Sequence, residues 1–269
     1  MHTLRLPLLI TVLGVIASAT FAETPAAKLL LSEDFESTPD GEVPKGFTKN
    51  GPVAVSEDTA HSGRKSLRIE PIAKGARTIT KQGPEIAALG GQFWGRLYFK
   101  VKLPAPLPAI PEGKTTASIH TTFVSGKATS PLFNDRIETR MMGTSSSTAG
   151  TFSWLYNVQP SGGRKEFGVG TKTKYKYTDE WTLAEWSVDN ATQSYRFFIN
   201  GQEVTEIAVS KGAGKFEGAE LPAVFESLTF GWLNYQAATE PGFTVWIDDL
   251  ALSKERIGPL VVPTKAPRK

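Results

Sequence analysis

The sequence has no cysteine and only three histidines. Without cysteine it forms no disulfide, no thiolate metal site and no iron–sulfur cluster, and it has no cysteine nucleophile. Three histidines also leave little room for a His-rich metal centre. The balance of 30 Lys and Arg against 27 Asp and Glu gives no electrostatic argument for a nucleic-acid partner. We therefore expect no nucleic-acid ligand, and a fold that depends on its apolar core.

The first 22 residues have the pattern of a cleaved secretory signal peptide. Arg5 is basic, an apolar run follows as far as Ala17, and no further charge occurs before Glu23. The run is short for a membrane span, and small residues suited to a cleavage site follow it, ending at Ala22. A retained N-terminal anchor is the alternative. We expect residues 1–22 to be removed, leaving a secreted or periplasmic protein with no membrane contact.

Long helical periodicity is missing from the rest of the chain, and strand-like alternation takes its place. Phe93–Val101 puts apolar residues on one face and polar or aromatic residues on the other. Asn200-Gly201 lies between two alternating runs and predicts a β-hairpin. Further strand candidates are Ser66–Glu70, Ala117–Val124, Arg136–Met142, Thr151–Val158, Glu185–Asp189, Ser194–Ile199, Ser227–Leu233 and Phe243–Leu252.

Many short strands without a helical layer predict an all-β fold, a two-sheet antiparallel sandwich of the jelly-roll type. Only Pro84–Leu89 is predicted to form a helical turn. Met142–Gly150 is small and polar, and we expect it to be flexible. We expect one domain over residues 28–257, a tail over residues 258–269, and a monomer.

Acidic residues near both ends of the domain suggest a calcium site. Glu36 follows the first strand candidate, and Asp248 lies in the last one. First and last strands often pair in a sandwich, and Ca²⁺ takes about six to eight hard oxygen ligands. The turn around Asp58 and His61 would add oxygens. The alternative is that these acids are solvated edge residues that discourage aggregation.

Several strand candidates carry polar and aromatic rows that would line a sugar-binding groove if they faced the same way. Aromatic faces stack on sugar rings, and arginine binds carboxylates in a bidentate fork. A groove of this kind suits an acidic polysaccharide. The rows are Trp94, Arg96, Tyr98 and Lys100; Ser118, His120 and Thr122; Arg136, Glu138 and Arg140; and Trp154 and Tyr156 with the adjacent Asn157.

Such a groove has the groups for β-elimination on a uronic acid. Arg140 would neutralise the uronate carboxylate, which makes the C5 proton easier to remove. His120 would take that proton, and Tyr156 or Tyr235 would protonate the leaving oxygen. The alternative is a surface ion-pair ladder with a structural histidine. No paired-carboxylate motif of the retaining laminarinase type is present, which disfavours a two-carboxylate hydrolase.

Several stretches together resemble the cellulose-induced, polysaccharide-lyase-like β-jelly-roll proteins, relatives of glucuronan lyases and, more distantly, alginate lyases. The resemblance covers about residues 30–258. The stretches that carry it are SEDFE (32–36), HSGRKSLRI (61–69), FWGRLYF (93–99), IHTTF (119–123), FFINGQEV (197–204), LTFGWLNY (228–235) and WIDDLALSKERIG (246–258).

The resemblance implies a concanavalin-like jelly roll with one structural calcium. It implies Glu36 and Asp248 as side-chain ligands, with oxygens from the turn at residues 58–62. Arg140 takes the place of the family's central arginine. Glu138 stands where that family has a histidine, and Thr144 stands where it has a glutamine.

The sequence thus predicts an exported protein that cleaves a uronate-containing polysaccharide by β-elimination. A non-catalytic carbohydrate-binding protein with the same groove is the second interpretation. A structural or envelope protein that uses the sandwich as a scaffold is the third.

Overall fold

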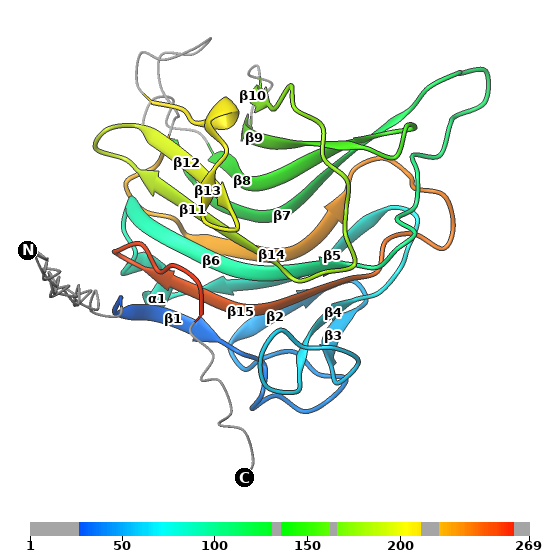
Figure 1. The fold of residues 1–269 in the computed structure, drawn as a ribbon. Coiled ribbons are helices and arrows are strands. Elements are labelled where there is room, and N and C mark those ends of the chain that lie inside the picture. Colours follow the sequence, from blue (N-terminus) through cyan, green and yellow to red (C-terminus); the bar gives the residue numbers. More distant parts are fainter. Residues whose placement is uncertain (1–26, 131–135, 162–165, 211–220, 261–269) are drawn as a thin grey trace, which may run out of the picture.

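Two antiparallel sheets pack face to face, as predicted for a jelly roll (Figure 1). The computed structural model describes residues 27–130, 136–161, 166–210 and 221–260. The predicted signal peptide therefore lies outside the described residues, as does the predicted tail beyond Leu260. Among the described residues, no helix is long and apolar enough to cross a membrane.

Sheet A contains the first and last described strands. Its order is β13-β12-β11-β6-β15-β4-β3, and β1 pairs with β15. That pairing confirms the expected meeting of the first and last strands. The strands are β1 (Leu29–Glu33), β3 (Val53–Ser56), β4 (Ser66–Ile69), β6 (Gln92–Val101), β11 (Thr182–Asp189), β12 (Ser194–Ile199), β13 (Gln202–Glu203) and β15 (Val245–Ser253).

Sheet B lies behind sheet A in Figure 1 and has the order β10-β9-β8-β7-β14-β5-β2. Besides strands, the described chain has a short helix α1 (Pro84–Ala87) and a 3-10 turn η1 (Thr205–Ile207). The strands of sheet B are β2 (Phe47–Asn50), β5 (Gly75–Gln82), β7 (Ser118–Thr129), β8 (Arg136–Ser147), β9 (Phe152–Pro160), β10 (Phe167–Gly170) and β14 (Ser227–Asn234).

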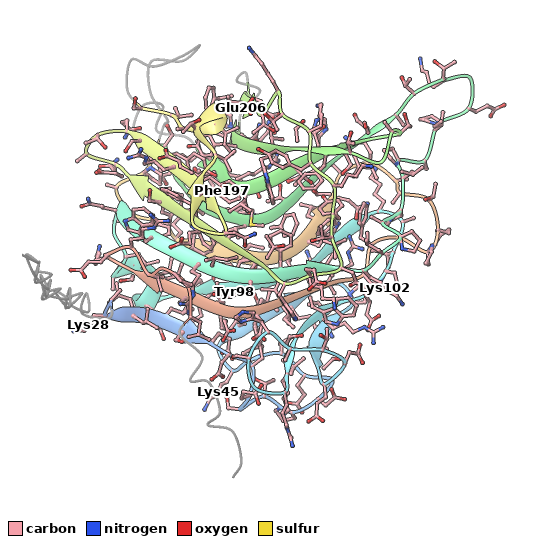
Figure 2. All side chains as sticks on the ribbon, in the orientation of Figure 1. Lys28, Lys45, Tyr98, Lys102, Phe197 and Glu206 are labelled. Atoms are coloured by element: carbon pink, nitrogen blue, oxygen red, sulfur yellow. The ribbon has the colours of Figure 1, made fainter. Side chains whose placement is uncertain are left out.

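The core between the sheets is largely aromatic. Phe197 of β12, labelled in Figure 2, meets the Trp154 ring of β9 with ring centroids 5.0 Å apart. Trp186 of β11 covers Gly95 so closely that a Cβ there would lie 2.1 Å from the indole. The Phe197–Trp154 contact joins the two sheets, whereas Trp186 and Gly95 pack together within sheet A. Burial of side chains from both sheets is the main source of stability in such a sandwich.

The predicted hairpin is present between β12 and β13. Asn200 has φ 48° and Gly201 has φ 79°, the paired positive values that a two-residue type I′ turn requires. Asn200 Oδ1 also accepts a hydrogen bond from the Leu183 N–H at 3.0 Å. The turn therefore ties this hairpin to the neighbouring strand.

The predicted flexible segment at residues 142–150 is wrong for its first part, because β8 continues to Ser147. Thr144 points inward, and its hydroxyl contacts the hydroxyls of Thr121 and Tyr177. Burial raises the pKa of Tyr177 to about 12. The small hydroxyl side chains at the start of this segment therefore belong to an ordered strand and not to a loop.

Candidate functional site

A pocket of about 350 Å³ opens on the face of sheet B that points away from sheet A. The side chains around it are mostly polar. They come from β7 to β10 and from the segment after β14. The lining residues are His120, Thr121, Thr122, Arg140, Gly143, Leu155, Asn157, Gln159, Glu166, Gly168, Tyr235 and Gln236.

Strand pairing brings the predicted catalytic groups His120, Arg140 and Tyr235 to this pocket from distant parts of the sequence. The Tyr235 N–H donates to the His120 carbonyl at 3.0 Å. In return, the His120 N–H donates to Gln236 Oε1 at 2.8 Å. Arg140 faces Asn157 across the β8–β9 ladder. These hydrogen bonds and the strand pairing fix the backbone positions from which the His120, Arg140 and Tyr235 side chains extend.

A bulge in β8 shapes the floor of the pocket. The β8–β9 register shifts between Arg140 and Gly143, and both Met141 and Met142 enter the core. A Cβ at Gly143 would lie 2.9 Å from the Thr121 carbonyl oxygen. Only glycine fits there without displacing the backbone, so the bulge keeps the pocket open beside Arg140.

Arg140 is held on all sides. Its Nε and Nη2 donate to Glu138 Oε2 at 3.3 and 3.2 Å. Its Nη1 donates to Asn157 Oδ1 at 3.1 Å and lies 3.7 Å from Glu166 Oε1. The Tyr235 ring covers the guanidinium at 4.5 Å. The cation is thus fixed in position, and two carboxylates lie against its single positive charge.

Tyr235 contributes a partly buried phenol to the pocket. Burial raises its pKa, and the neighbouring Glu138 carboxylate raises it further, so the phenol keeps its proton at neutral pH. Its hydroxyl lies 3.4 Å from the Thr122 hydroxyl. The phenol is therefore available in the pocket as a hydrogen-bond donor at neutral pH.

The prediction that Tyr156 and Trp154 face the groove is wrong. Tyr156 is fully buried and stacks on Tyr195 of sheet A, with centroids 4.0 Å apart. Trp154 is 2% exposed and lies among core aromatic rings. Strand alternation instead turns Leu155 and Asn157 toward the pocket, since large aromatic rings gain most by burial between the sheets. Asn157 is therefore the predicted residue of β9 that lines the pocket.

The prediction that Trp94, Arg96, Tyr98 and Lys100 line the groove is also wrong. They lie on β6 of sheet A, on its outer face, and Figure 2 labels Tyr98 there. Other residues of the same chain contact each of these four side chains. The Arg256 guanidinium lies 5.5 Å from the Trp94 ring, and Arg96 donates to the carbonyls of Asp249 and Gly258. The Leu260 N–H donates to the Tyr98 hydroxyl, and Lys100 pairs with Asp179.

Arg136 and Glu138 share the outer face of sheet B with Arg140. Arg136 pairs with Glu226 at 2.5 Å and lines a neighbouring hollow that Glu138 also lines. Glu138 further borders a hollow of about 150 Å³ over β5, β7 and β14, whose lining is rich in Thr and Ser hydroxyls. Thr122 belongs to both this hollow and the main pocket, so the recessed surface continues across the sheet.

The residues predicted to bind calcium lie away from this pocket. Asp58 and His61 belong to the turn between β3 and β4, and Glu36 and Asp248 contact that turn from outside it. Glu36 Oε1 accepts the N–H groups of residues 64 and 65 at 2.8 and 2.7 Å. Asp248 Oδ2 accepts those of residues 61 and 62 at 2.7 and 3.3 Å. Burial and the neighbouring Asp249 raise the pKa of Asp248 to about 7. Such a carboxyl is a chemically suitable partner for a cation.

The side chains of Asp58 and His61 have other partners. The Asp58 carboxylate pairs with Arg68 at 2.5 Å, and His61 Nδ1 lies 2.6 Å from Asp249 Oδ2. Within the described ranges, no group of three or more His, Asp and Glu side chains could hold a metal. The pairings of Asp58 and His61 concern side chains only, and the oxygens expected from the turn at residues 58–62 stay a prediction. Glu36 and Asp248 meet at the same turn, and calcium stays a prediction for these two.

Sequence reasoning missed Glu166, Gln159 and Gln236. Glu166 reaches Arg140 only because β10 pairs with β9 in the register that sets Gly168 opposite Asn157. The Asn157 amide donates to Glu166 Oε1 and to the Phe167 carbonyl. β10 has four residues, too few for a clear alternation signal. Gln159 was detectable, since it lies two residues beyond Asn157 on the same face.

Comparison with solved structures finds the same fold elsewhere. "Cellulose induced protein, Cip1" matches with 16% identity and a TM-score of 0.53, over 85% of this chain and 99% of that chain. The globular domain of T. cruzi calreticulin matches with 9% identity and a TM-score of 0.52, over 85% and 88% of the two chains. No protein-family model and no curated protein matches the sequence. At these identities the likeness establishes the jelly-roll fold alone.

Proposed function

We propose that the protein binds a polysaccharide on the outer face of sheet B and cleaves its uronic-acid units by β-elimination. The observation that carries the proposal is the convergence of His120, Arg140, Asn157 and Tyr235 at one pocket of about 350 Å³. These are an imidazole, a guanidinium, an amide and a phenol, the groups that this reaction needs.

The reaction follows from their chemistry. Arg140 and Asn157 neutralise the uronate carboxylate, which stabilises the charge that develops when the C5 proton leaves. The His120 imidazole takes that proton. The C4–O bond then breaks, a C4–C5 double bond forms, and Tyr235 gives its proton to the leaving glycosidic oxygen. The Tyr235 phenol is protonated at neutral pH, so this proton is present when the leaving group departs.

Non-catalytic carbohydrate binding is the second candidate function. The charge balance around Arg140 favours it, since Glu138 lies 3.2 Å and Glu166 lies 3.7 Å from the guanidinium. An arginine compensated in this way attracts an incoming carboxylate less than a free arginine does. The polar lining and the hydroxyl-rich neighbouring hollow also fit an uncharged sugar.

Two measurements on the mature protein separate the candidates. Lyase action on glucuronan or alginate produces an unsaturated uronate that absorbs at about 235 nm, after proton abstraction at C5. Rising absorbance supports cleavage. Retarded migration in a polysaccharide affinity gel without absorbance supports the binding function. Failure of both on a panel of acidic and neutral polysaccharides would leave only a scaffold role.

We also propose that the protein reaches its substrate by export. The pattern of the first 22 residues supports this, with one basic residue, an apolar run and a small-residue cleavage site. Mass spectrometry of the secreted or periplasmic fraction should find a chain that begins at Glu23. A full-length chain retained in the membrane fraction would contradict this.

A further inference from the structure

The Arg140 guanidinium has two carboxylate neighbours that differ in how firmly they are held. Glu138 accepts two hydrogen bonds from it, and the Glu138 side chain is 22% exposed. Glu166 lies farther away, at 3.7 Å from Nη1, and its side chain is 46% exposed. Glu138 is thus the nearer partner of Arg140, whereas Glu166 lies farther from Arg140, accepts from Asn157, and is more exposed at the rim of the pocket.

Glu166 sits where a ligand carboxylate would bind. Its Oε1 is close to both Arg140 Nη1 and Asn157 Nδ2, which donate from the same corner of the pocket. These two donors are the ones that the elimination chemistry assigns to the uronate carboxylate. The Glu166 carboxylate therefore occupies the position that the carboxylate of a bound uronate would take.

We propose that Glu166 is a specificity-determining residue that competes with the substrate carboxylate for Arg140 and Asn157. This rests on the proposed function, because it assumes that a uronate enters this pocket. On binding, the Glu166 side chain turns toward solvent and the uronate takes over its two donors. Exposed ion pairs are weak, so the exchange has a small cost. The competition lowers affinity for every acidic sugar and leaves neutral sugars unaffected.

The test is the variant Glu166→Gln, which removes the charge and keeps an oxygen that accepts from Asn157. We expect the Kd for alginate or glucuronan to fall about 1.5- to 5-fold, the range of an exposed ion pair. In turnover assays the same factor should appear in KM, with kcat unchanged. The gain should shrink at high salt, because exposed charges are screened.

Glu203→Gln is the matched control. Glu203 pairs with Arg196 at 2.8 Å on sheet A, so the substitution changes net charge equally without touching the pocket. Carboxyl-reduced alginate provides the matched neutral ligand. We expect Glu203→Gln to leave all affinities unchanged, and Glu166→Gln to leave affinity for the reduced polymer unchanged. In an Arg140→Gln background, the gain in affinity from Glu166→Gln should be smaller, because the competition for Arg140 is gone.

Equal or weaker binding of polyuronate by Glu166→Gln would overturn the inference, as would an equal gain in Glu203→Gln. Binding of polyuronate by the wild type without absorbance would refute the lyase function alone, and the affinity ratio would still decide the role of Glu166. If neither the wild type nor Glu166→Gln bound any polyuronate, both proposals would fail.

Discussion

The outer faces of the two sheets carry similar residues with different consequences. On sheet A, Arg96 is 5% exposed and donates to the carbonyls of Asp249 and Gly258. On sheet B, Arg140 is held by side chains at the wall of an open pocket. Both strands place basic residues at every second outward-facing position, with aromatic residues between them in β6 and Glu138 between two arginines in β8. The alternation therefore identifies an outward-facing row but does not tell whether the rest of the chain covers it.

The difference arises from what packs over each face. Residues 256–260 cross sheet A: Gly258 N–H donates to Glu185, and Arg256 lies over the Phe198 ring at 4.2 Å. On sheet B, the β8 bulge and Gly143 keep a recess open. The covered face gains packing and internal ion pairs, whereas the open face retains groups that a ligand can reach.

The largest expected effect comes from removing the groups at the open pocket. His120→Ala or Arg140→Ala should lower the lyase rate by about 10²–10⁴-fold, the usual contribution of a positioned acid–base or charge-stabilising group. Lys100→Ala, which breaks the ion pair with Asp179 on sheet A, should leave the rate within about twofold. Initial rates of absorbance increase measure this. An equal loss of rate in Lys100→Ala and in the pocket variants would contradict the claim that only the outer face of sheet B is functional.

Two tyrosine-to-phenylalanine changes sharpen the same contrast. Tyr235→Phe removes the proposed proton donor and should lower the rate about 100-fold. Tyr156→Phe changes a hydroxyl in the core and should preserve the rate, with a change in unfolding free energy of about 1 kcal/mol. Activity and denaturant titrations on both variants provide the comparison. Loss of activity in Tyr156→Phe with native stability would contradict the assignment of Tyr156 to the core.

The pH dependence of the wild type tests Tyr235 further. A proton donor must be protonated, and burial raises the pKa of Tyr235 above its ordinary value of 10.0. The rate should therefore hold through neutral pH and decline only above about pH 10. The rate constant is followed over the range in which circular dichroism shows a folded protein. A decline centred below pH 9 would assign the proton donor to another group.

A smaller effect is expected at the covered face. Arg256→Ala removes the partner of Glu185, whose side chain is 1% exposed. The Gly258 N–H still donates to that carboxylate, so we expect a loss of only about 1–2 kcal/mol of stability. Polysaccharide affinity should not change. A large loss of affinity with native stability would mean that sheet A takes part in binding.

The smallest expected effect concerns calcium. If Glu36 and Asp248 hold Ca²⁺, a chelator should lower the Tm by a few degrees, because a ligand bound only to the native state stabilises it. Glu36→Gln should lower the Tm and abolish the response to chelator. The same Tm with calcium and with excess chelator would refute the calcium prediction and leave the acids as structural residues.

The fold was largely predictable from local patterns, and part of the site was too. The alternation in β6 gave the inward face correctly, with Phe93, Leu97 and Phe99 all buried. His120, Arg140 and Tyr235 were identified from their chemistry and from the resemblance to a lyase-like family. Local sequence carries this information because each strand's period is fixed by its backbone.

The errors came from information that lies outside a single strand. In β9, Trp154 and Tyr156 alternate with Leu155 and Asn157, and only burial tells which pair faces the core. Glu166 reaches Arg140 through the register of β10 on β9, which no local pattern fixes. Which outer face remains accessible to a ligand depends in turn on the path of the segment after β15, which covers sheet A.

Hydrogen exchange with a bound uronate oligomer tests the central claim most directly. The inactive His120→Ala variant keeps the ligand intact during the measurement. Binding should slow amide exchange in β7, β8 and β9 and in the segment around Tyr235, with no change along β6 and β11. Protection confined to β6 and β11, with β7 to β9 unchanged, would contradict the account and move the binding site to sheet A.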